Sequence, residues 1–165
     1  MPDNPVSQPR HWYASLNLRL GLRAGKTRLL QAEHQGPLRV QRAFYPEGPL
    51  CHLYWLHPPG ALVTGDELHF SAHLESSASV LLTTPSAGKI YATEHCQDPQ
   101  QSHFTLNQDA DSILEWLPQE TLVFDGAQGQ ITTRFNLTAG AKLFAWDIVC
   151  LGRPASGDWF NVGSC

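Results

Sequence analysis

The sequence predicts an all-β fold, a multi-stranded sandwich or solenoid-like stack of short antiparallel strands with little helix. Two observations carry this prediction. Apolar and polar residues alternate with a period of two along most of the 165-residue chain, as they do in strands with one buried face. Glycine- and proline-containing turn signals interrupt the alternation about every ten residues. We see no convincing amphipathic helix.

The first expected strand shows the alternation most clearly, because every even position from Trp12 to Leu22 is apolar. By the same pattern, further strands are expected at residues 27–34, 38–44, 50–57, 67–75, 79–84, 89–93 and 102–107. Residues 112–124 predict a strand that is broken at Pro118, because proline cannot donate to a sheet ladder. The last two strands are expected at residues 130–138 and 142–151.

Composition restricts the class of protein. The chain of 18.3 kDa has 42% apolar and only 16% charged residues, which is typical of one domain with a real core. We place that domain at residues 12–165, after a disordered lead-in at residues 1–11. The net charge of −4 disfavours a nucleic-acid binder. No run of about 18 apolar residues is present, so no membrane association is expected.

The N-terminus has no basic start followed by an apolar stretch, so it does not resemble a secretory signal. We therefore expect a cytoplasmic protein. Its four cysteines are widely spaced and form no C-x-x-C pair, which favours reduced thiols. They are Cys51, Cys96, Cys150 and Cys165.

One expected strand carries a stripe of polar side chains that suggests a metal site. The stripe consists of Glu67, His69, Ser71, His73 and Glu75, which all share one face. Residues four apart on a strand are roughly 13 Å apart, too far for two imidazoles to bind one ion without a bend or a partner strand. A stripe that faces solvent is therefore the favoured interpretation.

Two isolated acids attract attention. Asp66 ends a turn that begins at Gly60 and contains Gly65, so it either stabilises that turn or offers an oxygen ligand to a cavity. Asp147 stands in the apolar stretch 143–151, where a buried carboxylate needs a hydrogen bond, an ion pair or a metal. A pair with Arg153 is the structural alternative for Asp147.

Two other functions are compatible with the composition. Glu115 and Glu120 lie on either side of a proline and could form the carboxylate pair of a β-sandwich glycoside hydrolase. Alternatively, Trp12, Trp55 and Trp116 could stack on sugars in a carbohydrate-binding module. Release of sugar, or quenching of tryptophan fluorescence by oligosaccharides, would distinguish these functions from others.

A series of short motifs then occurs in a fixed order. They occupy residues 36–42, 44–47, 51–54, 56–60, 65–66, 83–85, 89–91, 114–120, 124–127, 146–147 and 150–154. In that order they closely resemble the family of the urease accessory protein UreD, also called UreH. The resemblance extends from Trp12 to about Phe160.

The resemblance implies a non-enzymatic chaperone that binds apo-urease and, with UreF and the GTPase UreG, supports insertion of nickel. It also implies an unusual all-β, solenoid-like fold with a polar internal tunnel for nickel. The candidates for lining that tunnel are Asp66 and Asp147. No tightly bound cofactor is expected, only transient Ni²⁺, because scattered carboxylates release nickel more readily than thiolate or imidazole clusters do. The other motif positions, expected to be structural, are Gly60, Gly65, Lys89, Glu115 and Arg153.

The chain departs from the family pattern in two places. Ala61 and Thr64 replace glycines that the family usually has in this turn, and strain is expected if those positions require positive φ. Family members also continue for roughly 100 residues beyond Cys165, so the chain is expected to be truncated at its C-terminus. Open sheet edges and exposed apolar side chains should follow from such a truncation.

Overall fold

The computed structural model describes residues 12–93 and 98–165, so the expected lead-in and Cys96 lie outside it. Nearly all regular structure is β, which confirms the predicted fold class. One short 3₁₀ turn, η1, covers Pro154–Ser156. The strands are β1 (Tyr13–Arg23), β2 (Lys26–Gln35), β3 (Arg39–Val40), β4 (Cys51–Leu56), β5 (Glu67–Leu74), β6 (Ser79–Thr83), β7 (Gly88–Ile90), β8 (Gln100–Gln108), β9 (Ile113–Trp116), β10 (Thr121–Val123), β11 (Gly129–Leu137), β12 (Lys142–Ala145) and β13 (Val149–Leu151).

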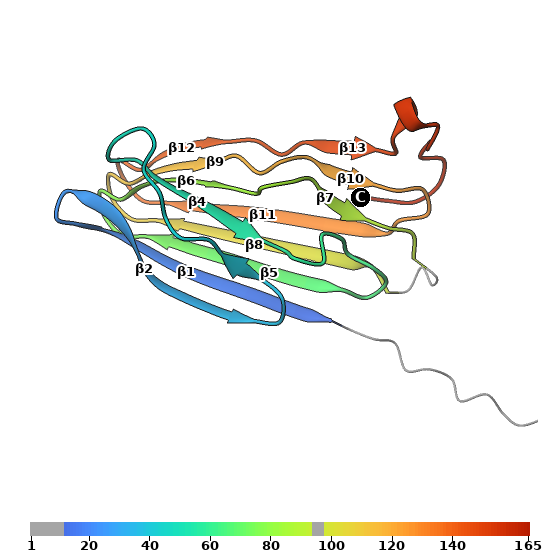
Figure 1. Ribbon diagram of the computed structural model, residues 1–165, viewed down its shortest axis with the longest axis horizontal. Helices are drawn as coiled ribbons and strands as arrows, with labels where there is room; N and C mark the ends of the chain where they lie inside the picture. Colours follow the sequence, from blue (N-terminus) through green and yellow to red (C-terminus); the bar gives the residue numbers. More distant parts are fainter. Residues whose placement is uncertain (1–11, 94–97) are drawn as a thin grey trace, which may run out of the picture.

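The strands form three sheets that wind into a solenoid (Figure 1). Sheet 1 has the order β11-β8-β5-β1-β2, sheet 2 the order β12-β9-β6-β4-β3, and sheet 3 the order β13-β10-β7. The chain visits the three sheets in turn, so β5-β6-β7, β8-β9-β10 and β11-β12-β13 are successive coils. A solenoid-like stack was expected from the sequence, and the structure has one.

The expected antiparallel pairing is wrong for most of the molecule. Between coils every strand pairs in parallel with its equivalent, as β5 does with β8 and β8 with β11. A coil leaves one sheet, passes through the other two and returns in the same direction, which makes its pairing parallel. Among the described strands, only β1 with β2 and β3 with β4 pair antiparallel.

The core fills the inside of the coils. Along β5, Leu68, Phe70, Ala72 and Leu74 are buried and point inward, while the residues between them face outward. Complete burial of such leucine and phenylalanine side chains contributes about 1.5–3 kcal/mol each. An aromatic cluster lies at the centre, where neighbouring ring centroids are 5.4–6.3 Å apart; it consists of Trp55, Phe70, Phe104 and Trp116.

Two expected strands differ from the observed ones. The strand expected at 38–44 is only Arg39–Val40, after which Phe44 forms an isolated bridge to His52. The strand expected at 142–151 is divided into β12 and β13, because the chain turns a corner of the solenoid at 146–148. The break expected at Pro118 is confirmed and marks the same corner in the preceding coil.

Two buried glutamines connect successive coils from the two ends of β8. Gln100 donates from Nε2 to the carbonyl of Tyr91 at 2.6 Å, and its Oε1 accepts the Gln128 amide at 3.3 Å. Gln108 donates from Nε2 to the carbonyl of Lys142 at 2.9 Å. Both side chains are almost completely buried, so these hydrogen bonds replace water that cannot reach the interior.

The last coil forms an edge of all three sheets. Several of its large apolar side chains are exposed, and they are Phe144, Trp146, Ile148, Val149 and Leu151. Open parallel strands together with exposed apolar groups favour association with other chains. The exposed apolar surface expected from the sequence is therefore located at β12, β13 and the corner between them.

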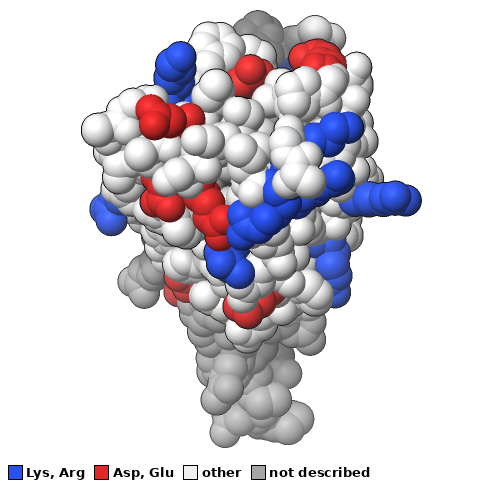
Figure 2. Space-filling model, turned by 90° about the vertical axis from the view of Figure 1, so that its left-hand side faces the viewer, with Lys and Arg blue, Asp and Glu red and all other residues white. Residues whose placement is uncertain are grey.

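Charged side chains are distributed unevenly at the end of the molecule where β1 turns into β2. Figure 2 shows most of the basic side chains in view on one side of this end and acidic ones on the other. Glu75 forms ion pairs of 3.1 Å with Arg19 and 2.9 Å with Arg23. These pairs are exposed to solvent and contribute little to stability.

Candidate functional site

A cavity of about 270 Å³ lies inside the solenoid, where sheet 2 gives way to sheet 3. Its wall is part aromatic, from Trp55, Phe104 and Trp116, and part polar. The polar residues come from the loop after β4, from the corners of the three coils and from β7, β8, β10 and β11; they are His57, Thr84, Ser86, Lys89, Ser102, Gln119, Thr121, Thr133 and Asp147. The corners of the three coils and the loop after β4 thus converge on one space, whose wall combines apolar and polar side chains.

Asp147 lines this cavity from the corner between β12 and β13. Its side chain is exposed to solvent, so the expectation of a carboxylate buried in an apolar strand is wrong. The corner is fixed by Trp146, which donates from Nε1 to the carbonyl of Pro118 at 2.8 Å. Pro118 turns the preceding coil between β9 and β10, and the last coil, which stacks on it, turns at the same place. Asp147 therefore stands at the cavity mouth.

Asp66 has the turn-stabilising role, and the role of oxygen ligand stays a prediction. Its amide donates to the carbonyl of Val63 at 3.0 Å, and its Oδ2 accepts the Val63 amide at 3.0 Å, so the carboxylate closes the turn from both ends. The side chain is buried, and burial raises its pKa above the ordinary 3.8, although the hydrogen bond from Val63 acts in the opposite direction. Asp66 also lines a second, smaller cavity of about 20 Å³.

The two cavities share a wall. His57, Leu62 and Leu68 line both of them, so Asp66 on one side and Asp147 on the other face adjacent spaces. Burial lowers the pKa of His57 below its usual 6.5, which keeps the imidazole neutral at pH 7. Two carboxylates and a neutral imidazole are groups that bind a divalent cation weakly and one at a time.

Comparison with known proteins decides the family. The sequence model described as "UreD urease accessory protein" matches residues 13–165. The chain belongs to the UreD family. This confirms the resemblance seen in the motifs.

Curated UreD relatives match nearly the whole chain. Urease accessory protein UreD of Saccharophagus degradans is 51% identical over 166 residues, which is 100% of this chain and 56% of that protein. The UreD of Hahella chejuensis is 52% identical over 98% of the chain and 52% of its own length, and that of Klebsiella aerogenes 48% identical over 93% and 56%. The chain spans about half the length of these relatives.

Three of the remaining UreD motif residues lie at the larger cavity or in the turn next to Asp66. Gly60 and Gly65 have φ of +72° and +75°, which explains why the turn requires glycine there. Ala61 and Thr64 are not among the described residues with positive φ, so the strain expected at these two positions is absent. Lys89 lines the larger cavity from β7.

The other two motif residues lie outside the cavities. Arg153 forms an ion pair with Asp158 and lies over the ring of Phe124, so the alternative pair with Asp147 is wrong. Glu115 lies on β9 on the opposite face from the inward Trp116. The contacts of Arg153 and the outward position of Glu115 suit a structural role better than a place on a cation route.

The structure does not favour the two sugar-related functions. Neither Glu115 nor Glu120 lines either of the cavities described above. Trp55 and Trp116 are 7% and 2% exposed and stack on one another with centroids 6.3 Å apart, so they present no flat surface to a sugar. Trp12 is exposed and lines the smaller cavity instead.

Sequence reasoning missed His57 as a site residue. A histidine directly before Pro58 and Pro59 offered a signal, because the two prolines fix the loop that carries it toward the turn at Asp66. No helix in the described part of the chain is long and apolar enough to cross a bilayer.

Proposed function

We propose that the chain is a urease maturation chaperone that binds apo-urease and, together with UreF and UreG, supports insertion of nickel into the urease metallocentre. The observation that carries the proposal is membership of a family described as urease accessory proteins. Two carboxylates that face adjacent interior cavities support it further. The proposed role is non-enzymatic and requires protein contacts and ion passage without covalent chemistry.

In this proposal nickel is a cargo that passes through the interior. A hydrated Ni²⁺ ion enters at the exposed carboxylate of Asp147, where the cavity reaches solvent. The ion keeps most of its water ligands, because the polar wall offers single oxygen atoms and no cluster. It then passes the shared wall at His57 and reaches Asp66. Movement of Leu62 or Leu68 widens the smaller cavity during this passage.

The charges of the wall keep the ion moving. Lys89 lines the same cavity as Asp147, and its positive charge reduces the attraction of that space for a cation. Burial of Asp66 stabilises its protonated form, so a proton competes with the ion at that carboxyl group. Both effects shorten the time that nickel stays bound.

The described cysteines are compatible with action in the cytoplasm. Cys51, Cys150 and Cys165 are all free thiols, as expected for a reducing compartment. Cys51 is completely buried, and burial raises the pKa of its thiol, so it does not compete for nickel.

The test is nickel incorporation into urease. Apo-urease subunits, UreF and UreG are expressed with and without this chain, and nickel bound to purified urease is measured by elemental mass spectrometry. Omission of the chain should lower bound nickel, and loss of co-purification with urease would show that the scaffold role fails. The same nickel content with and without the chain would contradict the proposed function.

The route is tested with Asp66→Asn and Asp147→Asn, which remove charge but keep shape. Asp111→Asn is the matched control, because Asp111 is exposed, lies outside both cavities and has a φ of +58° that asparagine accepts. Both cavity variants should lower bound nickel while still co-purifying with urease. Unchanged nickel in both would remove the route and leave the scaffold role.

A further inference from the structure

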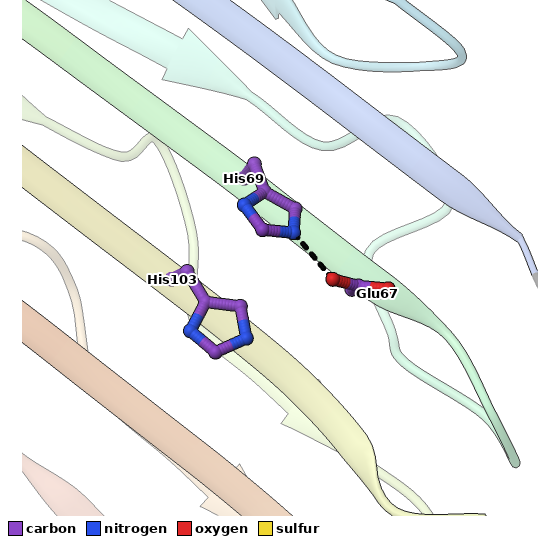
Figure 3. Close-up of side chains that lie close together, drawn as sticks. All are labelled: Glu67, His69 and His103. Atoms are coloured by element: carbon purple, nitrogen blue, oxygen red, sulfur yellow. Dashed lines mark hydrogen bonds and ion pairs between the residues drawn. The ribbon is translucent and has the colours of Figure 1, made fainter.

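The outer face of sheet 1 brings together metal-binding side chains, of which the two histidines line neither cavity. His69 on β5 pairs in register with His103 on β8, and both side chains point away from the interior. Their ring centroids are 4.8 Å apart, which is the ordinary spacing of neighbouring strands. Figure 3 shows the two imidazoles next to one another, with Glu67 beside them on β5. Strand β8 is thus the partner strand that a site on β5 requires.

The three side chains present their donor atoms to one small volume. Oε1 of Glu67 is 2.5 Å from Nε2 of His69, and one donor atom from each residue lies within 4.8 Å of the other two. Tetrahedral ligands of an ion bound at about 2.1 Å are roughly 3.4 Å apart, so donor atoms that lie within 4.8 Å of one another need to close by no more than about 1.4 Å. Small rotations about the side-chain torsions of half-buried residues achieve that movement.

Neighbouring side chains already hold both rings. The ring of Tyr13 lies against His69 with centroids 5.1 Å apart, and Oε1 of Gln101 is 3.2 Å from Nε2 of His103. Support of this kind orients histidine ligands and increases the affinity of metal sites. Nearby basic groups are engaged elsewhere, since Arg19 and Arg23 pair with Glu75 at the far end of the strand.

We propose that Glu67, His69 and His103 bind a divalent first-row transition-metal ion of the Ni²⁺, Cu²⁺ and Zn²⁺ class. Two imidazoles and one carboxylate favour these ions over Mg²⁺ and Ca²⁺, which require oxygen ligands throughout. His69 and His103 line neither cavity, whereas Glu67 also borders the smaller cavity beside Asp66. Leu68, which lines both cavities, points to the other face of β5. Among residues 12–93 and 98–165, this is the group of three such donors that lies within one ion's reach.

The test uses Zn²⁺ and Ni²⁺ as probes in calorimetric titrations of the full chain, with Mg²⁺ for comparison. His69→Gln and His103→Gln should each weaken binding of the transition metals at least about tenfold, the lower limit of what loss of a supporting group costs a metal site. The matched control is His73→Gln, on the same strand and face but paired with Asp109 at 3.1 Å, and it should bind like the wild type. Mg²⁺ should not bind at the same concentration.

A second measurement does not depend on the variants folding. Addition of paramagnetic Ni²⁺ to the wild type should broaden the imidazole NMR signals of His69 and His103 and leave those of His73 sharp. Absence of binding, equal affinity in the His69 and His103 variants and the wild type, or selective broadening at other histidines would each overturn the proposal. Equal loss in the His73 variant would do the same.

Discussion

Replacement of Gln100 by leucine tests whether buried polar contacts between coils stabilise the fold. The substitution keeps the approximate volume but removes the donor to Tyr91 and the acceptor for the Gln128 amide. A backbone group that loses its partner costs about 1 kcal/mol where water can replace it and up to about 3 kcal/mol where it cannot. Tyr91 is exposed and Gln128 half-buried, so the expected total loss is about 2–3 kcal/mol.

Urea denaturation followed by tryptophan fluorescence measures this loss, because Trp55 and Trp116 lie in the core. The control is Gln101→Leu, at the next position on the outer face, where a change within about 0.5 kcal/mol is expected. If Gln100→Leu changed the free energy of unfolding no more than this control does, the connecting role of the buried glutamine would be refuted. A lower m-value for that variant would instead indicate that a coil had opened.

Three further predictions concern Asp66, Gly36 and Asp125. Asp66→Asn should raise the free energy of unfolding at pH 7. Burial raises the folded-state pKa of Asp66, so the wild type loses stability as pH rises above about 3.8, whereas asparagine does not titrate. Urea titrations at pH 4 and 7 should therefore show that the stability advantage of the asparagine variant grows with pH. Gly36→Ala should lower the free energy of unfolding by about 2–3 kcal/mol, because φ is +71° and the new Cβ would lie 2.9 Å from the Tyr13 carbonyl oxygen. The control Gly25→Ala, where nothing lies near the new Cβ, should cost about 1 kcal/mol. Equal losses in the two variants would contradict the close approach at Gly36. Asp125 accepts the amides of Val162 and Asn161, which lower its pKa. Acidification through that lowered pKa should therefore reduce the hydrogen-exchange protection factors of these two amides, and Asp125→Ala should reduce them already at pH 7.

The sequence predicted where strands lie better than how they pair. Alternation of apolar and polar residues depends only on one face being buried, so it placed β1, β5 and β6 almost to the residue. Parallel and antiparallel strands share that alternation when their outer face is solvated. The direction of pairing depends on how a whole coil returns to its first sheet, which no local pattern contains.

The candidate site was predictable in the same uneven way. The position of Asp66 in a turn could be predicted, because glycines directly before an acid are a local signal of a turn. Asp147 was placed in a strand because its neighbours are apolar, but these side chains are exposed at the corner. In the observed register Ala145 pairs with Trp116, so two residues further on Asp147 comes level with Pro118. Aligning the coils would have revealed the corner, and it would have placed His103 beside His69.

Parallel stacking also has a consequence for how fast the chain folds. Gln101 pairs with Glu67 of the coil before it and with Gln130 of the coil after it, so each pairing closes a long loop. Closing a loop of about 30 residues costs roughly 3 kcal/mol of chain entropy in its length-dependent part, before any contact between coils repays it. Such a high contact order predicts folding in milliseconds to seconds, limited by the first meeting of two coils. Each later coil then adds to an edge that is already ordered.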